Sequence, residues 1–131
     1  MHTVMNVTQL NEDDFLRVVA DYRTRHSEWH YVGHRPAIVD FYAPWCGTCR
    51  QLAPVLEDVA ALYADQIVVY RVDVDECPAV AEAYNIRSLP TTLFVPMQGR
   101  PVKMMGAITE REIVRLVEEV LMQDELHRVE A

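Results

Sequence analysis

The sequence predicts an α/β domain in which a central mixed β-sheet is flanked by helices on both faces. Short apolar runs typical of strands alternate with segments whose apolar residues recur at helical spacing, in the order β-α-β-α-β-α-β-β-α. The runs 37–43 and 67–74 are almost continuously apolar, as expected for strands covered on both sides. Only a short turn separates the last two strands, which predicts an antiparallel hairpin before the final helix.

The first half of the chain is expected to supply two strands and two helices. Residues 4–7 predict a short strand, and Asn11 is suited to cap the following helix. One face of that helix is apolar and consists of Phe15, Val18, Val19 and Tyr22. Residues 23–36 lose the helical period and predict an inserted connector, which Trp29 and Tyr31 are expected to anchor to the sheet edge. The second helix has an apolar stripe formed by Leu52, Val55, Leu56, Val59, Leu62 and Tyr63.

The second half is expected to supply three strands and two helices. After the strand at 67–74, a short helix starts at Pro78 and ends near Tyr84, because proline suits a first helical position. Strands at 91–95 and 102–105 then flank the turn of the hairpin.

The last helix opens with a capping box, Thr109 and Glu112, and carries an unbroken apolar stripe. The stripe consists of Ile113, Leu116, Val117, Val120 and Leu121. The polar tail, residues 123–131, is expected to fray. At 131 residues, the whole chain 1–131 is expected to form a single domain, since about 150 residues is typical of one.

The charge balance excludes several classes of function. Twelve Lys and Arg against twenty Asp and Glu give a net charge of −8. Such a surface repels phosphate backbones and anionic lipid, so we expect no nucleic-acid binding and no membrane insertion. The longest apolar stretches, such as 67–70, are far shorter than the roughly 18 residues of a membrane span. The first residues show no signal-peptide pattern, which predicts a cytoplasmic protein; a periplasmic location stays open if a signal peptide has been removed.

Two of the three cysteines stand in Cys46-Gly47-Thr48-Cys49, between a buried strand and a helix. Residues i and i+3 of a helical turn are neighbours, and a disulfide needs Cα atoms about 4.4–6.8 Å apart. Thiol and disulfide forms can therefore interconvert with little backbone motion, as a redox centre requires. The helix N-terminus favours a thiolate on Cys46, whereas Cys49, one turn further in, should be shielded and act as the resolving thiol.

Asp40 is the second informative residue, because it interrupts the apolar run 37–43. A carboxyl group in a strand covered on both faces should have a raised pKa, since burial disfavours its charged form. The pattern alone leaves open the alternative of a surface aspartate on an edge strand.

Residues 39–50 resemble the active-site segment of thioredoxins, and the similarity continues through 52–54, 72–75, 86–91 and 106–107. It covers roughly residues 4–121, apart from the connector. The resemblance implies the thioredoxin fold and a thiol–disulfide oxidoreductase, above all a protein-disulfide reductase, with no cofactor and no metal. Its partners would be thioredoxin reductase as electron donor and disulfide-bearing client proteins, and the chain would act as a monomer.

The resemblance also assigns roles to the cysteine pair and to its surroundings. Cys46 would attack a client disulfide, and Cys49 would release the mixed intermediate and leave a Cys46–Cys49 bridge. Asp40 would accept the proton of Cys49 through water, and Arg71, where thioredoxins commonly carry lysine, would pair with Asp40. Further members of the site are Gly47 and Thr48 beside the cysteines, and a client-docking surface of Trp45, Leu89, Pro90 and Gly106. For Trp45, core packing is the alternative.

Two departures from the thioredoxin pattern bear on redox poise: Thr48 replaces the usual proline, and Tyr42 stands where many thioredoxins have tryptophan. The first alternative function is therefore an exported oxidase or reductase for periplasmic substrates. The second is a non-catalytic adaptor of the same fold that binds partners or zinc.

Other cysteine and histidine residues suggest weaker hypotheses. Cys77 precedes Pro78 at a helix start and is expected to be an incidental surface thiol; the alternative is an exposed regulatory thiol with a lowered pKa. The residues His26, His30 and His34 would form a metal-like stripe on a helix. Gly33 and Pro36 argue against a continuous helix there, so no metal site is predicted.

Overall fold

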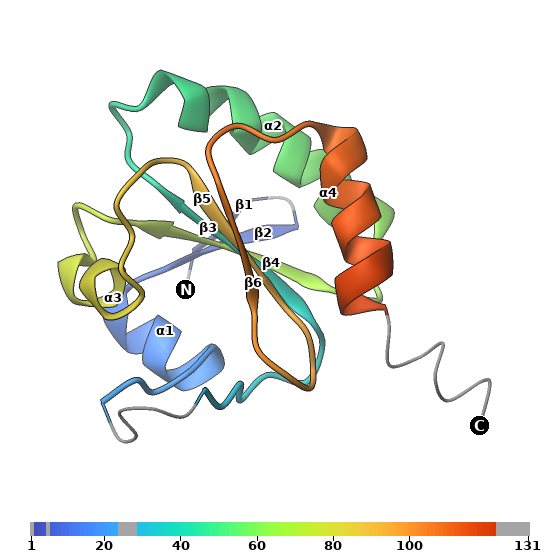
Figure 1. Ribbon diagram of the computed structural model, residues 1–131. Helices are drawn as coiled ribbons and strands as arrows, with labels where there is room; N and C mark the ends of the chain where they lie inside the picture. The colour runs from blue at the N-terminus through green and yellow to red at the C-terminus, as the bar shows by residue number, and fades with distance from the viewer. Residues whose placement is uncertain (1, 5, 24–28, 123–131) are drawn as a thin grey trace.

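Strand pairing in the computed structural model joins six strands into one sheet (Figure 1). The structure describes residues 2–4, 6–23 and 29–122. The elements, in chain order, are β1 (His2–Val4), β2 (Val7–Leu10), α1 (Glu12–Val18), β3 (Ala37–Tyr42), α2 (Gly47–Leu62), β4 (Val68–Asp73), α3 (Pro78–Ala83), β5 (Thr91–Val95), β6 (Val102–Met105), α4 (Glu110–Leu116) and the π-helical turn η1 (Val117–Leu121).

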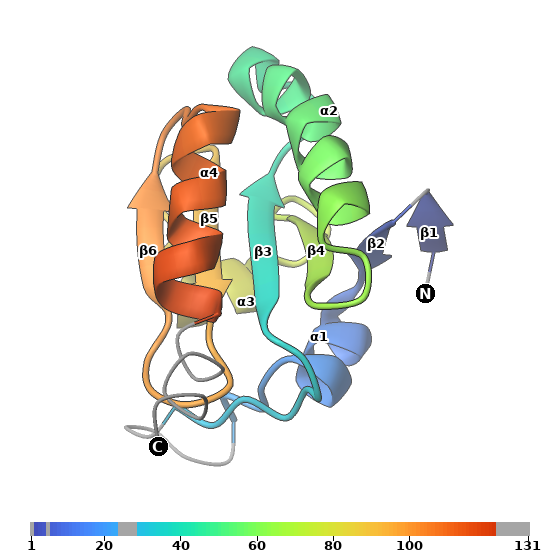
Figure 2. The same ribbon diagram turned by 90° about the vertical axis from the view of Figure 1, so that its right-hand side faces the viewer.

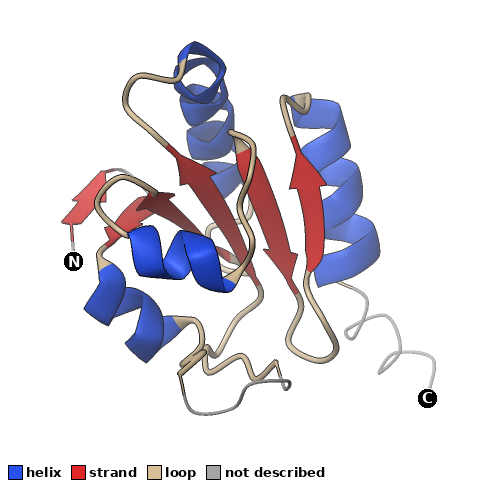
Figure 3. Ribbon diagram, turned by 60° about the vertical axis from the view of Figure 1, so that its left-hand side comes forward, coloured by secondary structure: helices blue, strands red, loops and turns tan. Residues whose placement is uncertain are grey.

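The sheet is mixed, with the strand order β1-β2-β4-β3-β5-β6. Strands β2, β4 and β3 run parallel, whereas β1, β5 and β6 run antiparallel to their neighbours. Helices α2 and α4 cover one face (Figure 2), and α1 and α3 cover the other (Figure 3). The predicted mixed sheet with helices on both faces is confirmed.

Each face of the sheet carries its own apolar cluster, because successive side chains of a strand point to opposite sides. In β3, Ile38 packs in the cluster under α2 and α4, together with Leu56, whereas Val39 and Phe41 pack in the cluster under α1 and α3. All of these side chains are fully buried. Asp40 shares the parity of Ile38, so its carboxyl group faces α2.

Helix starts follow the sequence closely. Asn11 caps α1 and forms a capping box with Asp14, and Thr109 and Glu112 form the predicted box at α4. Strands β5 and β6 have the predicted bounds. At the exit of α3, Asn85 adopts a positive φ of 54°, which asparagine tolerates better than most residues.

The prediction of a single strand at residues 4–7 is wrong. Residues 4–7 straddle a turn: β1 ends at Val4, and β2 begins at Val7 and pairs antiparallel with β1. Helix α1 also ends at Val18, earlier than its predicted apolar face, although the ring of Tyr22 still lies 6.2 Å from that of Phe15. Leu62 is 64% exposed and does not belong to the core stripe, because it lies on the outer face of α2, whereas its neighbours Ala60 and Tyr63 are buried.

The described part of the connector, 29–36, has neither helix nor strand, while 24–28 and the tail 123–131 lie outside the described residues. Trp29 packs edge-on against Tyr84, with ring centroids 5.9 Å apart. Tyr31 packs against the same apolar cluster and donates a hydrogen bond to the carbonyl of Arg35. The connector is thus anchored to the layer of α1 and α3 rather than to the sheet edge, because the aromatic rings there offer it an apolar surface.

Candidate redox site

The cysteine pair lies where β3 ends and α2 begins. A tight turn follows Tyr42, with the amide of Cys46 donating to the carbonyl of Ala43 at 3.1 Å. Cys46 is the N-cap of α2, and its Sγ accepts the backbone N–H of Cys49 at 3.2 Å. The sulfur of Cys46 therefore sits at the positive end of the helix dipole, beside backbone N–H groups that have no helical partner.

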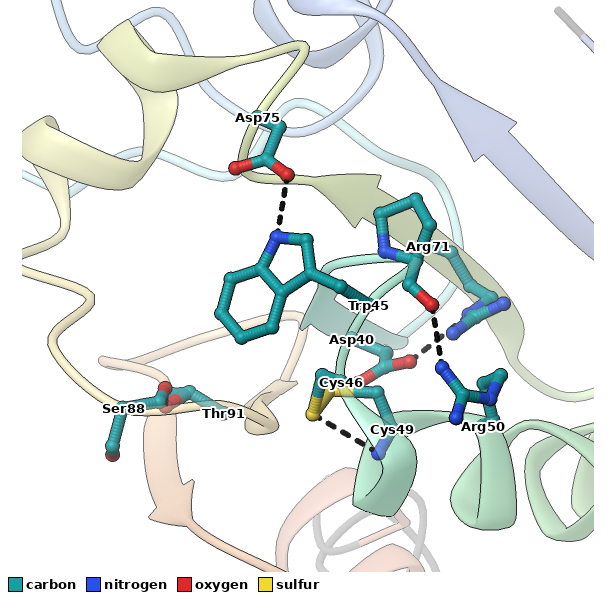
Figure 4. The surroundings of a disulfide bond; sticks show 10 residues. Asp40, Trp45, Cys46, Cys49, Arg50, Arg71, Asp75, Ser88 and Thr91 are labelled. Carbon is teal, nitrogen blue, oxygen red and sulfur yellow. Dashed lines mark hydrogen bonds and ion pairs between the residues drawn. A yellow bond between two sulfur atoms is a disulfide. The ribbon is translucent and has the colours of Figure 1, made fainter.

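Cys46 and Cys49 form a disulfide in this structure, with Cα atoms 5.3 Å apart (Figure 4). This separation lies within the range that a disulfide needs, as the two-residue spacer predicts. Cys46 is 9% exposed, and Cys49 is 0% exposed. The expected shielding of Cys49 is confirmed, and any incoming group meets Cys46 first.

Asp40 is fully buried on β3, which excludes the alternative of a surface aspartate on an edge strand. Burial raises the pKa of its carboxyl group to about 6, while the positive charge of Arg71 opposes this rise. Arg71 Nε donates to Oδ2 of Asp40 at 3.0 Å, the predicted pairing. Oδ1 has no hydrogen-bond partner among the residues that the structure describes.

Two residues that the sequence did not mark as site members complete this cluster. The Arg71 guanidinium lies over the ring of Tyr42, 3.7 Å from its centroid. Nε2 of Gln9 in turn donates to the Tyr42 hydroxyl. Tyr42 lies two residues after Asp40 and so shares its face of the sheet, a signal that was available in the sequence. The contact of Gln9 with Tyr42 depends on the order of the strands in the sheet, which the sequence does not give.

Trp45 is 68% exposed, so core packing is excluded for this residue. Its indole Nε1 donates to Oδ2 of Asp75 at 2.8 Å, which ties the ring to the loop after β4 (Figure 4). Gly47 and Thr48 are also exposed, at the start of α2. Asp75 belongs to the segment 72–75 that resembles thioredoxins, but its bond to Trp45 spans 30 residues of chain and was not anticipated.

The loop before β5 comes to the same end of the sheet. The Leu89–Pro90 peptide bond is cis, and Leu89 packs against the cluster of Ala43, Cys46 and Cys49. The amide of Gly106 donates to the carbonyl of Pro90 at 2.7 Å, which holds the two loops together. Gly106 has a φ of +85°, a conformation that favours glycine. The structure thus brings the residues predicted for a docking surface around the cysteine pair.

Cys77 does not meet either sequence expectation. Its thiol is 1% exposed, with Sγ 3.8 Å from the carbonyl of Leu10. Burial raises its pKa to about 11, and the neighbouring carboxylates, beginning with Glu12, add to this effect. Cys77 is neither a surface thiol nor one with a lowered pKa, because β2 and α1 pack over the start of α3.

The described members of the predicted histidine stripe lie on the exposed connector and do not join the cysteine pair. His30 and His34 are exposed, and His26 lies outside the described residues. Across the described ranges, no group of three or more His, Cys, Asp or Glu side chains is arranged to hold a metal ion. Nor does any helix within those ranges combine the length and apolar character that crossing a bilayer demands.

The chain is similar to known proteins over most of its length. Residues 6–119 match the family model described as Thioredoxin. The thioredoxin of Borreliella burgdorferi is 39% identical over 110 residues, which cover 84% of this chain and 93% of that protein. Thioredoxin 1 of Synechococcus elongatus is 41% identical over 86 residues, covering 66% and 80%. A crystal structure of chloroplastic thioredoxin z matches with a TM-score of 0.71 at 27% identity, covering 90% of this chain and 96% of that one.

Proposed function

Because this chain belongs to the thioredoxin family and is a thiol–disulfide oxidoreductase of the reductase type, we propose that Cys46 is its attacking sulfur and Cys49 its resolving sulfur. In the reduced protein, the Cys46 thiolate attacks one sulfur of a client disulfide. A Cys46–client disulfide forms, and the second client sulfur leaves as a thiolate. The observation that carries this assignment is the difference in access, since Cys46 is 9% exposed at the helix N-terminus and Cys49 is 0% exposed.

Asp40 is the proton acceptor of the second step. Cys49 gives its proton to Asp40 through water, and the resulting thiolate attacks Sγ of Cys46 and expels the client as a thiolate. Two electrons have then passed from the cysteine pair to the client, and the Cys46–Cys49 bridge is restored. The two client thiolates take up protons from solvent, and Asp40 returns the proton of Cys49 to solvent. A pKa of about 6 supports this role, because a carboxylate with a raised pKa binds a proton more readily near neutral pH.

The client binds across Trp45, Leu89, Pro90 and Gly106, with Gly47 beside the sulfur. An extended client segment pairs with the backbone near Leu89, as a strand pairs with a sheet edge. The exposed ring of Trp45 supports this surface, since its bond to Asp75 fixes the ring beside the turn that carries Cys46. Arg71 and Thr48 complete the surroundings of the cysteines, the former through its ion pair with Asp40.

Disulfide-bearing target proteins and a reductase are the partners of this family. We assign the reductase role for this chain to thioredoxin reductase, and place the protein in the cytoplasm as a monomer without a bound cofactor. Residues 1–131 form one domain, with 23–36 as an inserted connector and 123–131 as a tail. The oxidase and the adaptor alternatives are not favoured, because the relatives are thioredoxins of bacterial and chloroplastic origin.

The test is reduction of insulin driven by dithiothreitol. The wild-type chain is expected to accelerate the reaction, Cys46→Ser to abolish it, and Cys77→Ser, the matched control, to retain it. Cys49→Ser should accumulate a covalent adduct with the client through Cys46. A wild-type protein without activity overturns the proposal. A reduction potential of about −270 mV for the Cys46–Cys49 pair supports the reductase role, whereas one of about −120 mV indicates an oxidant.

A further inference from the structure

Three side chains form a row across the sheet, directly beneath α2. Gln9 of β2 is the register partner of Arg71 in β4, and Arg71 is the register partner of Asp40 in β3. Partners in register point to the same face, so all three lie on the side that α2 covers. Tyr42 follows Asp40 by two residues and stands on this face as well. The row therefore connects the edge of the parallel strands with the buried carboxyl group.

Arg71 is held in this row by two contacts of different kinds. Its Nε donates to Oδ2 of Asp40 at 3.0 Å, and its planar guanidinium lies 3.7 Å from the centroid of the Tyr42 ring. The hydrogen bond fixes the edge of the guanidinium, and the ring fixes its plane. With a side chain only 18% exposed, Arg71 has little water to replace either contact.

Tyr42 is itself held in place by Gln9, whose amide donates to the tyrosine hydroxyl. Burial raises the pKa of Tyr42, so the hydroxyl stays neutral. A neutral hydroxyl accepts the hydrogen bond of Gln9 without adding a negative charge beside Asp40. The three contacts thus run without interruption from Gln9 through Tyr42 and Arg71 to Oδ2 of Asp40.

The consequence for Asp40 is that its two oxygens have different surroundings. Oδ2 is bonded to Arg71, whereas Oδ1 is buried and has no hydrogen-bond partner in the described part of the chain. Arg71 is the charged group that acts on this carboxyl. Asp73 of β4 is the register partner of Tyr42 and acts on the Tyr42 hydroxyl, and α2, on the same side of the sheet, carries Cys49. Strand β5 contributes only Thr92, the register partner of Asp40.

We propose that Gln9 and Tyr42 are positioning residues for the proton transfer: they hold Arg71 on Oδ2 of Asp40 and so leave Oδ1 as the oxygen that receives the proton of Cys49. This inference rests on the proposed role of Asp40 as proton acceptor. Tyr42, a departure from the usual tryptophan, and Arg71, a departure from the usual lysine, act together in this chain.

The test follows the titration of the Asp40 carboxyl by ¹³C NMR in the oxidised protein, in which Cys46 and Cys49 cannot titrate. Arg71→Met is expected to raise the midpoint by about one to two pH units, because the compensating charge is lost. Tyr42→Leu should raise it by about half as much, since Arg71 loses its support. Tyr42→Phe keeps the ring and loses only the bond to Gln9, so its shift should be the smallest.

A double-mutant cycle shows whether Tyr42 acts through Arg71. In the Arg71→Met background, Tyr42→Leu should shift the midpoint no further, because the group that it supports is absent. Tyr63→Phe is the matched control, since the Tyr63 hydroxyl is bonded to Glu118, away from Asp40. This control should leave the titration unchanged. An unchanged midpoint in Tyr42→Leu, or an equal shift in both backgrounds, overturns the inference.

The rate of the resolving step separates this inference from the function on which it rests. In single-turnover release of a client from Cys46, the acid limb of the pH profile should move with the Asp40 midpoint in each Tyr42 variant. If Asp40→Asn leaves the release rate unchanged, the proton-acceptor role fails. If Asp40→Asn slows release but the Tyr42 variants keep the wild-type profile, only the positioning role fails. Where Tyr42→Leu does not fold, Tyr42→Phe, which preserves packing, still tests the contact with Gln9: a midpoint and a release profile identical to those of the wild type then overturn the positioning role.

Discussion

Replacing Asp40 with asparagine should stabilise the oxidised protein at neutral pH and slow its chemistry. The carboxyl group is fully buried, and among the residues that the structure describes its charged form accepts a hydrogen bond from Arg71 alone. Asparagine has nearly the same shape and keeps a carbonyl oxygen that accepts the Arg71 Nε–H. The substitution thus removes a buried charge without leaving Arg71 unbonded, but it also removes the proton acceptor.

The sign and the size of this stability change follow from the difference between the pKa of Asp40 in the folded protein and its pKa in the unfolded chain. The unfolded chain ionises this group at its ordinary value of 3.8, and the folded protein at about 6. Between these values the folded state binds the extra proton, so its stability falls as the pH rises and stays lowered above about pH 6. At about 1.4 kcal/mol per pKa unit, the full cost is about 3 kcal/mol. The asparagine side chain of the variant does not titrate and escapes this cost.

Urea unfolding of the oxidised wild type and Asp40→Asn tests this value at two pH conditions. The variant should be more stable by about 3 kcal/mol near pH 7.5 and by about 1 kcal/mol near pH 4.5. Asp58→Asn, on the exposed side of α2, is the matched control and should show neither gain. A gain independent of pH, or a loss of stability at pH 7.5, would refute the account of the buried charge.

Three further predictions concern parts of the fold outside the redox site. Cys77 in the native oxidised protein should resist iodoacetamide near pH 8 and react fully in urea, because its thiol is buried with a pKa of about 11; rapid native labelling contradicts this. Asn11→Ala should cost about 1 kcal/mol in urea unfolding through loss of the α1 cap, and no change would contradict the role of the box. Trp29→Ala should cost about 2 kcal/mol by the same measurement, since its ring packs on Tyr84; a cost near zero would mean that the connector is not anchored there.

The features that the sequence predicted correctly depend on near neighbours along the chain. The spacing of Cys46 and Cys49 is local, and so are the caps at Asn11 and Thr109. The burial of Asp40 follows from the apolar residues on both sides of it in one strand. In each case a few consecutive residues determine the geometry, because hydrogen bonds within a turn or the alternation of a strand leave little freedom.

What the sequence missed depends on contacts between distant segments. The bonds from Trp45 to Asp75 and from Gln9 to Tyr42 join residues 30 and 33 positions apart, and they require the strand order to be known. The sequence predicts a surface position for Cys77 because a helix start is usually accessible, whereas packing by β2 and α1 buries it. The strand at 4–7 was misplaced because β2 alternates poorly, with Val7 and Leu10 both buried.

Burial of the third cysteine limits the number of electrons that the folded protein can exchange. Of the three cysteines in the sequence, two share a bridge and Cys77 is sealed under α1 and β2. Each reduced molecule therefore carries a single pair of reducing equivalents and has one sulfur, that of Cys46, that oxidants can reach. Covalent dimers in aged samples, where they form, must join at Cys46, and a thiol assay of the folded protein will report the state of the bridge alone.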